Sequence, residues 1–414
     1  MHAPHSTGDR IVTETVSAWQ VWWAFLRLGL TSFGGPVAHL AFFRDEFVGR
    51  RRWLDEQAYA DIVALCQFLP GPASSQVGMA VGLIKAGYRG AAAAWLGFTL
   101  PSAVLMVGLA LGLTAVEGQV ATGALSGLKV AVVAVVAQAV WSMGRTLCPD
   151  ALRLTLMALT ASVVWLAPVL WVPWVCLLVA GGVGVIRLSS QGVSTPLVRV
   201  SHRVGRRAGL AWLALFVAGL VLLPWLAHGV SSEAIDLVAA FYRAGAWVFG
   251  GGHVVLPLLQ AELVPSGWVE PEVFLAGYGL AQAVPGPLFT VAAYLGAAAS
   301  HGPGGWLGGM LALLAIFAPS WCLVAGVLPF WDDLRRHLQA RAALAGVNAS
   351  VVGLLLAALY QPVWVSAIDG APDVALALLA GVALMVWRWP AWLVVALCAA
   401  VGAAVGALAP FAAG

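Results

Sequence analysis

The residues best placed for chemistry surround a Pro-Gly-Pro triplet in the stretch QFLPGPASSQ, residues 67–76. Proline removes an amide donor and clashes with the preceding turn, so one helix ends at the triplet and another begins after it. The first turn of a helix carries unpaired N–H groups and a partial positive charge, which favour a bound anion. The predicted substrate-binding residues here are Gln67, Gly71, Ser74, Ser75 and Gln76.

A second Pro-Gly-Pro triplet stands in AQAVPGPLFTV, residues 281–291. Gln282 precedes it at the spacing at which Gln67 precedes the first, and Thr290 is the hydroxyl in the turn that follows. Two helix N-termini aimed at one point suit an oxyanion with four peripheral oxygens, because many donors share its diffuse charge. This copy lacks the Ser-Ser-Gln run, so Gly286, Gln282 and Thr290 form the weaker half of the predicted site.

Three basic residues lie within otherwise apolar segments, where a charge is costly and points to function. Arg27 and Arg243 occupy the same place in two similar stretches, and Lys129 has Asn348 as its counterpart. Each basic residue is predicted either to add positive charge to an anion pathway or to extend its side chain to the membrane surface.

Two glycine pairs, Gly34-Gly35 and Gly250-Gly251, follow the two arginines and are also included in the predicted site. They either break a helix beside the substrate or let neighbouring helices approach closely. The Pro-Gly-Pro triplets have a similar alternative, since proline also kinks membrane helices that merely pack. Their repetition beside glutamine in both halves favours the binding role.

The composition is that of an integral membrane protein. Of 414 residues, 61% are hydrophobic and only 9% charged, whereas soluble domains are nearer a quarter charged. The N-terminal residues show no short apolar core with a small-residue cleavage site, so we expect no removed signal peptide. The five cysteines are scattered without metal-ligand spacing and are predicted to be small buried residues. No cofactor is expected.

An internal repeat decides the architecture. LRLGLTSFGGPVAHLAFF (26–43) matches YRAGAWVFGGGHVVLPLL (242–259), and the two Pro-Gly-Pro stretches match at nearly the same offset. FTLPS (98–102) likewise matches IFAPS (316–320). We therefore predict an all-α polytopic membrane protein with two transporter repeats, each containing broken or re-entrant helices. The predicted units are a cytoplasmic tail (1–18), a first repeat (19–187), a basic linker with one connecting span (188–234) and a second repeat (235–414).

Each repeat contains six apolar segments, and one more lies between the repeats. They are 19–47, 58–83, 90–116, 122–145, 152–167 and 169–187, then 209–228, then 235–262, 273–300, 304–328, 340–360, 372–388 and 391–412. An odd number of crossings separates the copies, so the repeats are predicted to be inverted, with the substrate near the bilayer midplane between them.

The basic residues separate two topologies, because cytoplasmic loops collect Lys and Arg. Of the 21 basic residues, 18 lie outside the apolar segments. With thirteen full spans, Arg44 and Arg50–Arg52 would face outside. With re-entrant hairpins for the first two segments of each repeat, all 18 fall on the cytoplasmic side, and we favour this topology. Both topologies place the N-terminus inside and the C-terminus outside.

These stretches closely resemble the chromate ion transporter family, long two-domain type, over about residues 19–410. The resemblance implies an inner-membrane protein that exports chromate, a tetrahedral dianion similar to sulfate, from the bacterial cytoplasm and confers resistance to it. The positions that match the family motifs are Gly34, Gly35, Pro36, Gln67, Pro70, Gly71, Pro72, Gln76, Gly250, Gly251, Pro285, Gly286 and Pro287.

The predicted function is secondary active export of chromate by alternating access, with sulfate as a competitor. The alternative is a permease or exchanger for sulfate or a related oxyanion. An enzyme is not expected, since the sequence has no metalloprotease, serine hydrolase, Walker or dinucleotide-binding motif. The expected partners are the oxyanion and the lipid bilayer, but not nucleic acid, and the sequence leaves a homodimer open.

Overall fold

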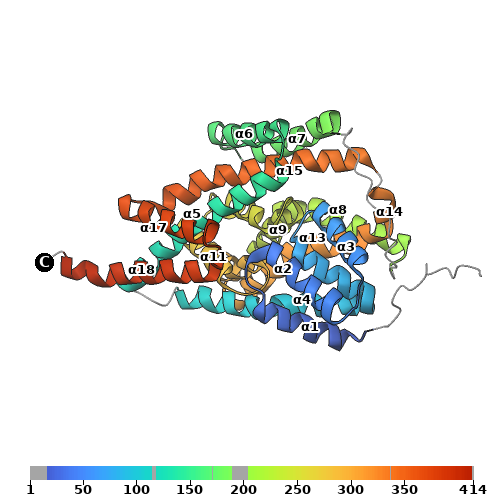
Figure 1. Ribbon diagram of the computed structural model, residues 1–414, viewed down its shortest axis with the longest axis horizontal. Coiled ribbons are helices and arrows are strands. Elements are labelled where there is room, and N and C mark those ends of the chain that lie inside the picture. Colours follow the sequence, from blue (N-terminus) through green and yellow to red (C-terminus); the bar gives the residue numbers. More distant parts are fainter. Residues whose placement is uncertain (1–15, 114–117, 170, 189–203, 336, 413–414) are drawn as a thin grey trace, which may run out of the picture.

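The computed structural model describes residues 16–113, 118–169, 171–188, 204–335 and 337–412, so most of the predicted tail and basic linker lies outside the described residues. Every regular element in the described part is a helix (Figure 1). Six of its helices are long and apolar enough to cross a membrane, which confirms the predicted all-α polytopic fold. They are Ala73–Gly112, Gln119–Leu147, Arg206–Gly229, Gly305–Leu334, Leu338–Ala367 and Ala391–Leu408.

The helices of the two halves follow the repeat. The first half consists of α1 (Ala18–Thr31), α2 (Gly35–Arg44), a π-helical turn (Asp45–Arg50), α3 (Glu56–Phe68), α4 (Ala73–Leu113), α5 (Gln119–Leu147), α6 (Ala151–Leu166) and α7 (Val172–Leu188). After α8 (Arg206–Gly229), the second half consists of α9 (Glu233–Ala246), α10 (Val255–Leu263), α11 (Pro271–Ala283), α12 (Val291–Ala297), α13 (Gly305–Val327), α14 (Trp331–Leu334), α15 (Leu338–Ala358), α16 (Val365–Ala367), α17 (Ala371–Met385) and α18 (Ala391–Ala412).

The chain turns back at the first Gly-Gly break. Phe25 on α1 packs against Phe43 on α2, and its ring centroid lies 4.9 Å from that of Phe47 in the π-helical turn. A straight helix would separate residues 25 and 47 by about 33 Å at 1.5 Å per residue. α1 and α2 are therefore the two legs of a hairpin.

α4 contains a sharp turn that separates a short leg from a spanning helix. Ala86 and Gly87 have non-helical backbone angles, and the backbones of Gly82 and Gly90 touch across the turn. The part of α4 before Gly87 is about 20 Å long, too short to cross a bilayer. It is the second leg of the hairpin that begins with α3.

The second half forms the same two hairpins. An ion pair between Arg243 and Glu262 joins α9 to α10. A side chain at Gly277 on α11 would run into the ring of Tyr294 on α12. Both pairs of helices therefore fold back on each other, so each half begins with two helical hairpins.

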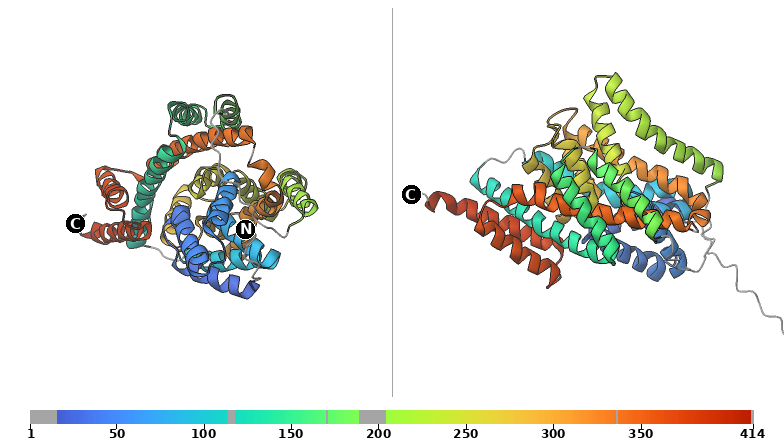
Figure 2. Two further views of the ribbon diagram at one scale, coloured as in Figure 1. Left: turned by 45° about the vertical axis from the view of Figure 1, so that its right-hand side comes forward. Right: turned by 90° about the horizontal axis from the view of Figure 1, so that it is seen from above.

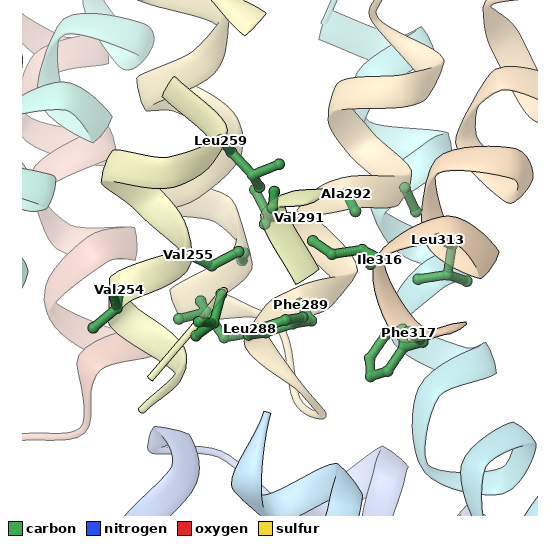
Figure 3. Packing of buried hydrophobic residues seen from close by; sticks show 14 of the residues in the cluster. Val254, Val255, Leu259, Leu288, Phe289, Val291, Ala292, Leu313, Ile316 and Phe317 are labelled. Carbon is green, nitrogen blue, oxygen red and sulfur yellow. The ribbon is translucent and has the colours of Figure 1, made fainter. Parts of the chain in front are cut away.

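The hairpins, α4 and α13 form a core, which is covered on one side by a second layer that we call the scaffold. The core is tightly packed where α10, α12 and α13 meet (Figure 3). In the scaffold, α5 and α15 arch across the core (Figure 2). α17 and α18 of the second half pack on α5, whereas α6 and α7 of the first half pack on α15. The scaffold is thus built by exchange of helices between the halves.

One end of the molecule collects many of the basic side chains, and we call it the basic end. Arg44 pairs with Glu56 at the start of α3, and Arg335 after α14 pairs with Asp61 on α3. These contacts place the loops after α2 and α14 together. α8 lies outside the core, and its most apolar stretch has no residue buried within the protein, as expected for a helix that faces lipid.

Candidate functional site

Four helix breaks meet inside the core, at residues 32–35, 69–72, 247–251 and 284–287, and we call this region the break centre. The Gly71 amide donates to the Val248 carbonyl at 2.6 Å, and the Gly286 amide donates to the Ser32 carbonyl at 3.0 Å. The sequence match relates Ser32 to Val248 and Gly71 to Gly286, so the two hydrogen bonds are equivalent under exchange of the halves. Each Pro-Gly-Pro break is thereby bound to the Gly-Gly break of the other half.

Glycine is required in both triplets by conformation and by space. φ is +126° at Gly71 and +103° at Gly286, where a side chain is strained. A methyl group at Gly286 would lie 2.6 Å from Ser102 Oγ, and one at Gly71 would overlap Ser320 Oγ. Ser102 and Ser320 end the matching FTLPS and IFAPS stretches of α4 and α13. The long helix of each half therefore presses a hydroxyl group onto the break of the other half.

The polar residues after the first triplet are buried beside the break centre. Gln76 is fully buried, and its side-chain amide donates to the Pro70 carbonyl at 2.6 Å and to Ser320 Oγ at 3.3 Å. Ser75 Oγ and Gln76 Oε1 are buried and have no hydrogen-bond partner among the described residues. Leaving a buried polar atom unpaired costs about 1–3 kcal/mol. A water molecule or a polar ligand would therefore be stabilised here.

The second triplet offers fewer free groups. Thr290 Oγ1 donates to the Pro287 carbonyl at 2.8 Å and so is occupied within its own turn. Gln282 is buried, and its Nε2 has no partner among the described residues. The first half thus presents more polar groups than the second, in the order expected from the sequence.

The histidines beside the Gly-Gly pairs are packed into the core. His39 is buried, with its Nδ1 3.4 Å from Ser74 Oγ and its ring against Phe98. His253 Nδ1 lies 2.9 Å from the Tyr278 hydroxyl. Across the described residues, no three His, Cys, Asp or Glu side chains are grouped so that they could hold a metal ion.

A cavity of about 480 Å³ lies between α3 and α15 at the basic end, and its lining includes Phe68, directly before the break at residues 69–72. Gln67 and Asn348 line its opposite walls, and Asn348 Oδ1 lies 3.5 Å from the position of a Cβ at Gly250. Its charged lining residues are Arg153, Arg335, Arg341 and Asp61. Arg335 pairs with Asp61 and Asp332, and Arg153 pairs with Asp150, so carboxylates balance these two arginines.

A second cavity, of about 910 Å³, lies at the opposite end between the α9–α10 hairpin and α6, α7 and α15. None of its lining residues belongs to the four breaks. Arg243 and Glu262 lie in its wall as an ion pair, with 3.0 Å between Nε and Oε1. The positive charge predicted for Arg243 is therefore balanced by a carboxylate 19 residues further along the chain.

Neither Arg27 nor Lys129 lines either of the two cavities. Arg27 is exposed on α1, and Lys129 is half-buried on α5. Glu46 is the sequence counterpart of Glu262, but it pairs with Arg50 at 2.8 Å and Arg51 at 2.6 Å. The two halves thus use matching Arg and Glu residues differently.

Three serines at the break centre were not among the predicted site residues. Ser32 is fully buried, its carbonyl accepts from Gly286, and its hydroxyl has no partner among the described residues. Ser102 and Ser320 contact the triplets from α4 and α13. The matched Pro-Ser pairs of FTLPS and IFAPS were the available signal for the last two.

Comparison with known proteins identifies relatives over most of the chain. A family model described as Chromate transporter matches residues 19–185 and again residues 235–403. A chromate transport protein of Pseudomonas aeruginosa is 30% identical over 341 residues, covering 81% of this chain and 79% of that protein.

Two further relatives are more distant. A probable chromate transport protein of Synechococcus elongatus is 26% identical, with 81% of each chain covered. An uncharacterized transporter of Methanocaldococcus jannaschii is 25% identical, with 86% of this chain and 88% of the relative covered. No solved structure matches the chain.

Proposed function

The chain belongs to the chromate transporter family, and we propose that it exports chromate from the bacterial cytoplasm as a secondary active transporter. The proposal follows the names of the relatives, two of which are called chromate transport proteins or probable ones. It places the protein in the inner membrane, with the basic end in the cytoplasm because cytoplasmic loops collect Arg and Lys. The N-terminus would then be cytoplasmic and the C-terminus outside.

The proposed binding site rests on the convergence of the four breaks. Backbone groups of the breaks form hydrogen bonds with one another, whereas buried polar side-chain atoms beside them have no partner among the described residues. Broken helices persist inside a membrane only where protein covers them or where they line a polar cavity. In the proposed site, the first-turn amides of α4, at Ala73 to Ser75, and the Ser75 hydroxyl donate to chromate oxygens. The Gln282 amide donates from the other half.

The amides of Gly71 and Gly286 have a different part in this account. Both donate to carbonyl groups of the opposite half, so they position the two triplets and do not contact the substrate. Gln76 would release Ser320 and turn its amide toward the anion. A tetrahedral dianion with four equivalent oxygens matches donors that arrive from several directions.

Export of a dianion needs no nucleotide under an inside-negative membrane potential. Moving one charge through 100 mV is worth about 2.3 kcal/mol, so a dianion gains about 4.6 kcal/mol on leaving the cell. In the proposed mechanism the halves, residues 19–187 and 235–414, alternate in exposing the site to each side, and residues 188–234 connect them.

Chromate flux into everted membrane vesicles tests the substrate and the direction together. Expression of the chain should increase chromate accumulation in everted vesicles, and an excess of sulfate should reduce it by competition. Accumulation of sulfate but not chromate, together with growth on limiting sulfate and no chromate resistance, would instead assign the chain to sulfate uptake.

A further inference from the structure

The two halves have the same hairpins but different contacts with the scaffold. In the second half, α11 packs directly on α5, since a Cβ at Gly279 would lie 3.1 Å from Val132 Cγ2 and 3.3 Å from the Leu128 carbonyl oxygen. Gly250 lies against α15 in the same way, with its Cβ position 3.2 Å from Val351 Cγ1. The second-half hairpins are docked on the scaffold.

The corresponding first-half residues stand apart from the scaffold. Ala64, the counterpart of Gly279, lines the basic-end cavity on α3, and Leu344 and Ala345 of α15 line the facing wall. Gly34, the counterpart of Gly250, has only Ala38 of its own helix near its Cβ position. The cavity thus occupies the space in which a first-half contact equivalent to α11 on α5 would form.

The two cavities differ in how near they come to the break centre. The basic-end cavity is lined by Phe68, next to the break at residues 69–72, and by Asn348, whose Oδ1 lies 3.5 Å from the Cβ position of Gly250. The cavity at the opposite end has Arg243 and Leu354 in its wall. Since the sequence repeat makes the halves alike in fold, the same chain is compatible with a second arrangement in which the two sets of contacts are exchanged.

We propose that the basic-end cavity is the vestibule through which a tetrahedral dianion reaches the break centre, and that the second state closes it by docking α3 onto α15 while α11 leaves α5. The proposal rests on the transport function above and names the surfaces that move. In the second state Ala64 packs against Val351, just as Gly279 packs against Val132 in the present state. The opening between α11 and α5 exposes Gln282 and Lys129, the counterparts of Gln67 and Asn348.

The exchange also gives the two vestibules differently placed charges. Arg341 in the basic-end cavity corresponds to Thr122, and Gln57 corresponds to Glu272. The opposite vestibule therefore has one arginine fewer and one carboxylate more at these positions, with Lys129 as a cation close to the break centre. Asp61 in the basic-end cavity corresponds to Ala276, so these matched positions have the same net charge in both vestibules and differ in where the charged groups lie.

Paired cysteines on a background without the five native cysteines test the exchange. Ala64→Cys with Ala345→Cys reports the second state, because these residues face each other across the cavity. Ala283→Cys on α11 with Leu125→Cys on α5 reports the present state, because both residues pack against the cluster formed by α5, α17 and α18. Trp165→Cys with Tyr360→Cys is the control within the scaffold, where the two exposed rings have centroids 5.8 Å apart.

The experiment uses molybdate as the probe, since it is a tetrahedral dianion that does not oxidise thiols as chromate does. With a short dimaleimide, the Ala283/Leu125 pair should link in membranes without the anion. The Ala64/Ala345 yield should rise several-fold with molybdate and an applied potential, and a link there should abolish flux. The Trp165/Tyr360 link should form in every condition and leave flux unchanged.

The outcomes separate this inference from the proposed function. If molybdate shifts cross-linking from the Ala283/Leu125 pair to the Ala64/Ala345 pair but no chromate flux is measured, the two states are supported and the substrate assignment is refuted. Chromate flux in vesicles in which Ala64/Ala345 never links, although both single cysteines react with a maleimide, overturns the exchange. Flux that continues when either moving pair is linked also overturns it.

Discussion

Replacing Gly71 with alanine tests the idea that the triplets are held by backbone contacts between the halves. At φ +126° an alanine is strained by about 1–3 kcal/mol. Its methyl group would also overlap Gln76 Nε2 and Ser320 Oγ, so the hydrogen bond between those atoms is lost, which costs about 0.5–1.5 kcal/mol. Together these effects destabilise the folded protein by about 2–4 kcal/mol.

The assay is the midpoint of thermal unfolding of the purified protein in detergent. With an unfolding entropy of about 2.1 cal/mol/K per residue, 2–4 kcal/mol lowers the midpoint of a chain of this length by about 2–5 °C. Gly108→Ala is the matched control, because that glycine lies in α4 with nothing within 4 Å of its Cβ position. It should leave the midpoint unchanged or raise it slightly, since alanine is the better helix former.

The Gly71→Ala result also has an internal check. Gly286→Ala should be destabilising for the same reasons, because a methyl group there would lie 2.6 Å from Ser102 Oγ. If Gly71→Ala and Gly286→Ala both unfold at the temperature of Gly108→Ala, the interlocked break centre is refuted.

Three further predictions concern charged groups. Glu262→Gln removes the partner of Arg243 and should destabilise the protein by about 1.5–3 kcal/mol; adding Arg243→Gln should recover part of the loss, and additive effects would show that the pair is not coupled. Arg50→Cys should react with an impermeant maleimide in everted vesicles only, and reaction in intact cells would contradict the cytoplasmic basic end. Asp150 caps α6 by accepting from the Arg153 amide at 2.9 Å, and this bond lowers the pKa of its carboxyl below the ordinary 3.8; Asp150→Ala should cost about 1 kcal/mol at pH 7. Because the folded pKa is the lower one, the stabilisation is present above pH 3.8 and is lost as the pH falls through the folded value, so a loss beginning near pH 6 would contradict it.

The positions of the helix breaks could be predicted because proline and glycine act locally. Both Pro-Gly-Pro triplets and both Gly-Gly pairs interrupt helices in the structure. Whether a break makes a hairpin or a kinked span depends on side chains far apart in the chain, such as Phe25 and Phe47. The distribution of arginines indicated hairpins only because it reflects the same topology.

The binding surfaces were harder to predict than the breaks. The hydrogen bonds of Gly71 and Gly286 join backbone groups, which leave no mark in the residue types, so these amides could not be distinguished from free donors. The pairing of Arg243 with Glu262 could have been proposed from the sequence, because the matching residues Arg27 and Glu46 are also 19 residues apart in the first half. That Glu46 instead pairs with Arg50 and Arg51 depends on the π-helical turn.

The conformational difference between the halves could not be read from the repeat. Matching sequences predict matching folds, and the hairpins do match. In this structure α11 packs on α5, whereas α3 is separated from α15 by the cavity. This difference belongs to the conformation of the whole molecule, so the sequence repeat does not reveal it. Lys129 illustrates this limit, since it follows Leu128, which packs against Gly279 of α11, whereas its counterpart Asn348 lines the basic-end cavity.

The measurement that tests the central claim most directly is chromate flux into everted vesicles carrying Gln76→Ala or Ser75→Ala. Gln138→Ala is the control, because its amide lies 3.4 Å from the Leu384 carbonyl within the scaffold. At equal protein level and thermal stability, both site variants should lose most of the flux while Gln138→Ala retains it. Normal flux in both site variants would contradict an oxyanion site at the break centre.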